Sequence, residues 1–285
     1  MATFDVKNAS TELRLHEATE SVSGNTYAAL FIEDLEERWN EIDLLIEKIK
    51  VQKEEEEGFV NVLCRSAIVL LVAHLEGFMK EAASVIIKEL NHHVNFSQVP
   101  KSLQKTYTTF FLSLDKNGNF DNNKQKRLLD EFENLNAKLL VDPFLFEQNK
   151  NPSPTIIEKI LHNFGVSDFF RLINKSKLDI VFENNPTETS ELLEEIKEYI
   201  QKATIKYPYN IDLNIFNISM KEEKLNRRNS LWITFVDELL RLRHSIAHGS
   251  TFSNEITIND IIDFKNKVHI LQYGIALVLF KASVK

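Results

Sequence analysis

Apolar residues recur at three- and four-residue steps in four long stretches of the chain, which predicts a largely helical protein. The first two stretches are Tyr27–Lys53 and Phe59–Leu90. The last two begin at Ser230, a good N-cap residue, and at Asn259 or Asp260. The fold class expected from this periodicity is therefore all-α.

Between about residues 92 and 228, short apolar segments alternate with turn-forming pairs such as Asp142-Pro143. Shorter helices are predicted there over Lys124–Leu140, Pro154–Asn163 and Thr187–Lys202. No linker-like stretch brackets this region. We interpret it as a large, mainly helical insertion into a helical core, with an independent second domain as the alternative.

These boundaries define a single domain over residues 1–285, with its core at 27–90 and 230–283 and the insertion at 92–228. Gly249 is a natural stop for the helix that begins at Ser230. The following segment, Thr251–Ile258, is expected to form a short hairpin or a loop.

The amino-acid composition limits the fold class and indicates the redox environment of the protein. Seven Gly and six Pro are too few for the many tight turns of an all-β fold. The single cysteine, Cys64, excludes an intrachain disulfide and any multi-cysteine metal centre. We therefore expect a reduced, cytoplasmic protein.

The net charge and the length of the apolar runs indicate whether the chain binds nucleic acid or a membrane. Lys and Arg number 34 against 42 Asp and Glu, a net charge of −8, so any nucleic acid must be held by a local basic cluster. The longest apolar runs, Ala67–Ala73 and Gly274–Phe280, are far shorter than the roughly 20 residues of a membrane span. Met1–Glu20 carries four acidic residues and does not resemble a signal peptide. No membrane association is expected.

The most informative segment is Arg241-Leu-Arg-His-Ser-Ile-Ala-His248, at the end of the helix that begins at Ser230. Arg243 offers a permanent planar cation suited to phosphate oxygens, and His248 a group that exchanges protons near neutral pH. Together they could cleave RNA without a metal. Five residues rotate about 140° around a helix, so the pair does not strictly share a face, whereas His244 and His248 do. The simpler interpretation is a helix end whose cations complement its dipole.

A metal site is the weaker interpretation of the same residues. His244 and His248 have the spacing of a zinc-binding pair, but Ser245 stands where zinc proteases carry glutamate. No third ligand is evident. We predict no metal and no cofactor, and a metal-dependent hydrolase would be recognised by its sensitivity to a chelator.

Arg243-His-Ser-Ile-Ala-His248 resembles the R-x4-H motif of the HEPN (higher eukaryotes and prokaryotes nucleotide-binding) superfamily, in which a polar residue follows the arginine. The segment Ala73-His-Leu-Glu-Gly-Phe-Met-Lys80 resembles the buried E-G-F-x-K helix of the MAE-type prokaryotic branch. The resemblance covers about residues 27–90 and 230–283 and leaves the middle of the chain uncovered.

The resemblance implies a helical bundle that dimerises with its motif helices facing each other across a shared cleft. It also implies endoribonuclease activity that needs no metal and leaves 2′,3′-cyclic phosphate and 5′-hydroxyl ends. Arg243 would then hold the scissile phosphate, His248 would act as general base or acid, and His244 would orient the phosphate or its partner histidine. Glu76 and Lys80 would support the site.

Three further arginines near the motif, Arg241, Arg227 and Arg228, are candidate RNA contacts. HEPN toxins that are silenced by AMP transfer carry a tyrosine two residues after the motif histidine, where this chain has Ser250. Another form of control is therefore expected, such as a cognate antitoxin or a defence-system partner protein.

Two functions follow from these observations. The first is a homodimeric HEPN endoribonuclease that acts on RNA as a toxin or an anti-phage defence effector. The alternative is a non-catalytic HEPN-like module that binds RNA, a nucleotide or a protein. The presence of both Arg243 and His248 favours the enzyme, and the acidic net charge favours the module.

Overall fold

The computed structural model describes residues 25–51, 57–112, 120–145, 151–219, 230–249 and 256–284. Every regular element in these ranges is helical, which confirms the all-α prediction. The α-helices are α1 (Tyr27–Val51), α2 (Glu57–His93), α3 (Lys101–Phe110), α4 (Asn122–Asn134), α5 (Pro154–Asn163), α6 (Phe169–Ile173), α7 (Pro186–Thr204), α8 (Leu231–Ala247) and α9 (Ile258–Ala282). Short 3₁₀ helices include η2 (Phe96–Gln98), η3 (Asp142–Phe144), η4 (Lys177–Phe182) and η5 (Leu213–Phe216).

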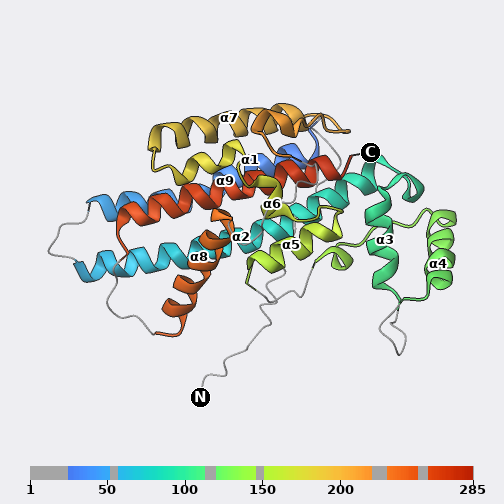
Figure 1. Ribbon diagram of the computed structural model, residues 1–285, viewed down its shortest axis with the longest axis horizontal. Coiled ribbons are helices and arrows are strands. Elements are labelled where there is room, and N and C mark those ends of the chain that lie inside the picture. The colour runs from blue at the N-terminus through green and yellow to red at the C-terminus, as the bar shows by residue number, and fades with distance from the viewer. Residues whose placement is uncertain are drawn as a thin grey trace, which may run out of the picture.

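Three long helices form the centre of the molecule. Helices α1, α2 and α9 pack against one another along its long axis, and α7 covers α1 and α9 on one side (Figure 1). Helix α9 is buried without interruption from Val268 to Phe280. A helix that is apolar on every face is stable in water only when neighbours surround it, and α1, α2, α7 and η4 surround this one.

Helix α2 is long and apolar enough to cross a membrane by length and composition, although its uninterrupted apolar runs are short. A soluble core helix passes the same test. Leu71, Leu75 and Phe78 are buried where α2 packs with α1, α8 and α9. Its N-terminal half also carries exposed apolar side chains, of which Phe59 is 50% and Val62 46% exposed.

The middle of the chain packs into the same core as the two ends. Residues of η4, α5 and α7 belong to one continuous buried cluster with α1, α2, α8 and α9. At Gly274 a Cβ atom would come within 2.9 Å of Leu178 Cδ1, so the absence of a side chain lets η4 lie close against α9. Helix α3 and the 3₁₀ elements were not predicted from the sequence, and α4 ends at Asn134 rather than at Leu140.

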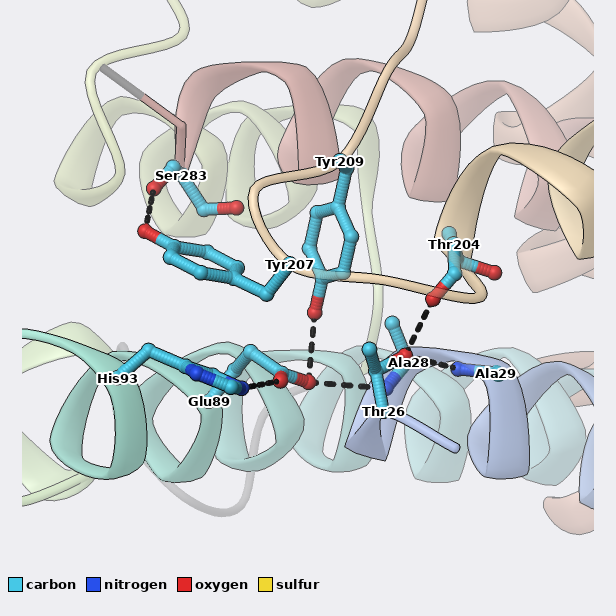
Figure 2. Close-up of polar contacts among 9 residues, drawn as sticks. All are labelled: Thr26, Ala28, Ala29, Glu89, His93, Thr204, Tyr207, Tyr209 and Ser283. Atoms are coloured by element: carbon cyan, nitrogen blue, oxygen red, sulfur yellow. Dashed lines mark hydrogen bonds and ion pairs between the residues drawn. The ribbon is translucent and has the colours of Figure 1, made fainter. Parts of the chain in front are cut away.

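A buried carboxylate of α2 joins three distant parts of the chain, namely α2, the start of α1 and the segment after α7 (Figure 2). Glu89 of α2 is 1% exposed; it accepts hydrogen bonds from Tyr209 Oη at 2.7 Å and from the Ala28 N–H at the start of α1 at 3.3 Å. His93 Nε2 lies 2.9 Å from its other oxygen, and the His93 ring stacks on Tyr207. Burial and the Glu89 charge raise the pKa of Tyr209, so its hydroxyl stays a hydrogen-bond donor. His93, in the exposed last turn of α2, thus adds a further polar contact to Glu89.

Candidate functional site

Helix α8 carries the motif, and its N-terminal half anchors it in the core. Trp232, Phe235, Val236 and Leu239 are buried. Trp232 is fully enclosed, and its Nε1–H donates to Asp179 Oδ1 of η4 at 2.7 Å. Ser230 occupies the predicted N-cap position, but its side chain makes no capping hydrogen bond. Packing, rather than capping, therefore fixes the start of this helix.

Aromatic rings and a cation surround this anchor. Phe182 of η4 meets Trp232 edge-on with ring centroids 4.8 Å apart, and Phe235 stacks on Phe264 of α9 at 6.0 Å. Lys267 Nζ lies 5.1 Å from the centroid of the Phe182 ring, within the range of a cation–π interaction. Helix α8 is thus held by α2, against which it packs most extensively, and by the aromatic contacts with η4 and α9.

The C-terminal half of α8 runs outward from the bundle (Figure 1). Arg241, His244 and His248 are exposed, and Arg243 is half-buried. His248 is the C-cap residue; its N–H donates to the His244 carbonyl at 3.0 Å, and the Gly249 N–H donates to the Ile246 carbonyl at 3.2 Å. Gly249 has φ +64°, a left-handed conformation that glycine adopts without strain, so it ends the helix as the sequence predicts.

The two motif histidines lie together. The ring centroids of His244 and His248 are 4.2 Å apart, with 52° between the ring planes. Arg243 makes no hydrogen bond or ion pair with the residues that the structure describes, so its guanidinium group is available for a ligand. This helix end therefore combines a cation that has no partner among the described residues with two neighbouring imidazoles, and these are groups that can bind a phosphate and move a proton.

The segment Ala73–Lys80, which also carries the family resemblance, contains an ion pair of its own. Lys80 Nζ donates to Glu76 Oε1 at 2.7 Å across one turn of α2, and both side chains are partly exposed. Leu75, Phe78 and Met79 of this segment are buried. Within the described ranges, no hydrogen bond or ion pair joins Glu76 or Lys80 to the motif histidines, and their supporting role stays a prediction.

Several predicted features lie outside the described residues. They are Arg227, Arg228, Ser250 and most of the expected hairpin at Thr251–Ile258. Among the residues that are described, no group of three or more His, Cys, Asp or Glu side chains is placed to hold a metal ion. Cys64 is buried as a free thiol, and burial raises its pKa.

A partly buried acid–base cluster at the contact of α1, α7 and α9 was not predicted from the sequence. Glu36 of α1 bonds His269 Nε2 at 2.8 Å and Tyr273 Oη, both of α9, and pairs with Lys197 of α7 at 3.0 Å. The His269 ring also stacks on Trp39, with centroids 4.8 Å apart. His269 and Tyr273, four residues apart in the largely apolar C-terminal half of α9, were the available signal. The cluster holds three helices together.

This cluster makes the fold sensitive to acid. Burial alone would raise the pKa of Glu36, but bonds from His269, Tyr273 and Lys197 lower it to about 2. Burial also lowers the pKa of His269 below 6.5. Both groups bind protons more readily in the unfolded chain, so we expect the free energy of unfolding to fall as pH drops below about 6 and through the range where Glu36 protonates. Glu36 should account for about 1–2 kcal/mol of this loss once solvent screening is allowed for.

Urea unfolding followed by circular dichroism between pH 7 and about pH 2 measures this dependence. Glu36→Gln should flatten the pH profile, because glutamine cannot titrate. Glu198→Gln is the matched control, since Glu198 forms an exposed ion pair with Lys202 and should leave the profile unchanged. Parallel pH profiles for the parent and Glu36→Gln would contradict the assignment.

A cavity of about 380 Å³ lies where α7 and α9 begin. Its polar walls consist largely of Asn, Asp and Thr side chains. The carboxylates there already have partners: Asp260 accepts the N–H and hydroxyl of Thr257 in a capping box, and Asp263 pairs with Lys267. The cavity thus belongs to the helix ends rather than to the motif.

An all-α bundle that presents Arg243 and His248 of an R-x4-H motif at an exposed helix end has the features of a HEPN domain. A family model described as RiboL-PSP-HEPN matches residues 33–277. The chain therefore belongs to the RiboL-PSP-HEPN family, which confirms the HEPN assignment. The match also spans the middle of the chain, which the sequence resemblance did not cover; the finer MAE-type assignment stays a prediction. Comparisons with curated proteins and with solved structures give no significant match.

Proposed function

We propose that this protein is a metal-independent endoribonuclease that cleaves RNA by attack of the ribose 2′-hydroxyl on the adjacent phosphate. One observation carries the proposal: Arg243, without a protein partner in the described chain, stands at the same exposed helix end as the paired rings of His244 and His248. HEPN domains are often ribonucleases, which agrees with this chemistry.

The proposed reaction uses each group for one task. His248 removes the proton of the 2′-hydroxyl or protonates the departing 5′-oxygen. Arg243 binds the non-bridging phosphate oxygens, whose negative charge grows in the transition state. His244 holds the phosphate or the second imidazole in place, and Arg241 contacts the flanking backbone. The bond to the 5′-oxygen breaks as the 2′,3′-cyclic phosphate forms, so the products carry cyclic phosphate and 5′-hydroxyl ends.

The test is incubation of the purified protein with total RNA in excess EDTA, followed by analysis of the new ends. Cleavage with cyclic phosphate ends supports the proposal. If EDTA abolishes cleavage and added metal restores it, the metal-free mechanism is wrong. If RNA is bound but never cut, the protein is the non-catalytic module.

We further propose that the enzyme acts as a cytoplasmic toxin or anti-phage effector, restrained by an antitoxin or a defence-system partner. A ribonuclease that requires no cofactor is active wherever it meets RNA, so a cell needs such a restraint. Growth after induced expression, with and without His248→Ala, tests this role: inhibition by the parent alone supports it, and unimpaired growth with the parent contradicts it.

The site is proposed to be shared between two copies of the chain. Leu240, Leu242 and Ile246, on the outward half of α8, are only half-buried, and Phe59, Val62 and Val69 of α2 are exposed. Apolar side chains on two helices that pack together form a surface that a second copy would cover. Facing motif helices would bring two arginines and two histidines into one cleft.

Light scattering after size-exclusion chromatography is expected to give a dimer for the parent and a monomer for Val62→Glu. Val62 is 46% exposed, so the new charge should be tolerated in the folded monomer but not in a buried interface. Ile205→Glu is the control, because Ile205 is 55% exposed on another part of the surface. A parent that is monomeric, or a Val62→Glu variant that stays dimeric, would contradict this interface.

A further inference from the structure

A cationic cavity lies between α3 and α4, in the part of the chain to which the motif assigns no role. Its volume is about 230 Å³. It is lined by Lys101, Gln104, Lys105, Thr108, Asn122, Gln125, Lys126 and Leu129. Three side chains of this lining are ammonium groups, the other polar ones are amides and a hydroxyl, and none is a carboxylate.

Polar side chains hold the two walls of the cavity together. Gln125 Nε2 of α4 donates to Thr109 Oγ1 of α3 at 2.8 Å, and Asp121 caps α4 by accepting the N–H groups of Asn123 and Lys124. Phe132 of α4 packs on Tyr107 of α3, with ring centroids 5.2 Å apart. The spacing of the walls is thus set without the lysines, whose ammonium groups remain available.

A buried amide lies beneath these ammonium groups. Gln104 is 1% exposed, and its Nε2 donates to the Phe96 carbonyl at 2.7 Å. Its Oε1 has no hydrogen-bond partner among the described residues. This oxygen is also closed to solvent, and a buried acceptor without a donor costs about 1–3 kcal/mol.

The lysines of the cavity differ from many others in the protein. Lys177, Lys197 and Lys265 each form an ion pair with a carboxylate. Lys101, Lys105 and Lys126 are exposed and have no carboxylate partner in the described structure. Lys101 and Lys105, four residues apart on one helix, repel each other. An anionic ligand would remove this repulsion.

The local charge contrasts with that of the whole chain. Residues 101–112 and 120–129 carry five cationic side chains and one carboxylate, a net charge of +4 in a protein whose net charge is −8. The other carboxylates of α4, Asp130, Glu131 and Glu133, follow in its C-terminal half and do not line the cavity. Exposed Phe110, Phe111 and Phe120 stand at the adjoining helix ends, where aromatic rings could stack on bases.

We propose that the α3–α4 cavity binds the backbone of a single RNA strand outside the cleavage site. The lysines of the cavity bind its phosphates. Helices α3 and α4 lie at one end of the molecule, whereas the C-terminus of α8 projects elsewhere (Figure 1). The choice of RNA as ligand rests on the proposed ribonuclease function, and this second contact would select substrates long enough to reach both sites.

Binding of a fluorescein-labelled, 15-nucleotide single-stranded RNA tests the cavity by fluorescence anisotropy. All proteins carry His248→Ala so that the probe stays intact, which a gel verifies. Adding Lys105→Glu and Lys126→Glu should weaken binding by on the order of tenfold and reduce the salt dependence by about 1.4 in log–log slope, the value for two lost phosphate contacts. Lys202→Glu with Lys206→Glu, the same charge change at exposed positions near the end of α7, should alter the affinity less than about twofold.

Equal weakening by the two double variants would show that net charge alone matters and would overturn the proposal, as would no weakening by either. Competition separates a strand from a free nucleotide: AMP or inorganic phosphate that displaces the RNA at equal concentration overturns the assignment to a strand. Cleavage by the parent protein is measured separately. Failure of the binding test therefore leaves the ribonuclease proposal standing, and failure of the cleavage test leaves the measured binding result unchanged.

Discussion

Replacing His248 with alanine is expected to reduce RNA cleavage by about 10²–10⁴-fold, the usual contribution of a general acid or base. The side chain is exposed at the C-cap of α8, and the capping hydrogen bond comes from the backbone N–H, which alanine retains. The variant should therefore fold like the parent, so a loss of cleavage reports chemistry. Initial rates in EDTA, measured on a defined RNA, provide the comparison.

His162→Ala is the matched control for this experiment. His162 is also an exposed histidine in the last turn of a helix, α5, but has no place in the motif. Its removal should leave the cleavage rate within about twofold of the parent's, since exposed substitutions away from a site change little. Equal cleavage by the parent and His248→Ala, with identical circular dichroism spectra, would falsify the assignment of the active site to the end of α8.

Replacing Trp232 with alanine is expected to lower the free energy of unfolding by about 3–5 kcal/mol, the cost of removing a large aromatic side chain from a core. Trp232 is fully buried, packs on Phe182, and donates its indole N–H to Asp179. Its loss leaves a void between α8 and η4 and removes one hydrogen bond from a partly buried carboxylate whose pKa burial raises. Urea unfolding at pH 7 measures the effect.

Two further substitutions separate packing from hydrogen bonding at this position. Trp232→Phe retains most of the buried area but not the N–H donor, so it should cost less than Trp232→Ala. Leu231→Ala, one residue earlier and 52% exposed in the parent, should change stability by less than about 0.5 kcal/mol. A loss below about 1 kcal/mol in Trp232→Ala would show that η4 does not anchor the motif helix.

The sequence predicts the long helices well because their periodicity is an intrinsic property of an amphipathic segment. Tyr27–Val51, Glu57–His93 and Pro154–Asn163 lie within a few residues of their predicted bounds, and Gly249 ends α8 as expected. Helix α3 was missed because Lys101–Phe110 follows a proline and mixes Lys, Gln and Thr with few apolar residues. It is buried through Leu103, Tyr107 and polar groups that bond locally, which no periodic pattern reveals.

The residues of the candidate site could also be predicted only where their signal is local in the sequence. Arg243, His244 and His248 could be named from the sequence because their chemistry and spacing are local, and the four-residue step between the histidines places their rings together. The cluster around Glu36 could not be named, because its members come from α1, α7 and α9. The α3–α4 cavity likewise depends on which face of α4 meets α3.

The sequence by itself determined the all-α class, the main helix bounds and the residues of the motif, since each depends on side chains within one helix. Only the tertiary structure decided how α8 is held and where it points. The contacts of Trp232 with Asp179 and Phe182 join residues about 50 positions apart, and burial between distant segments leaves no local pattern in the chain. The lysines of α3 and α4 likewise line one cavity only because the two helices pack together in the folded chain.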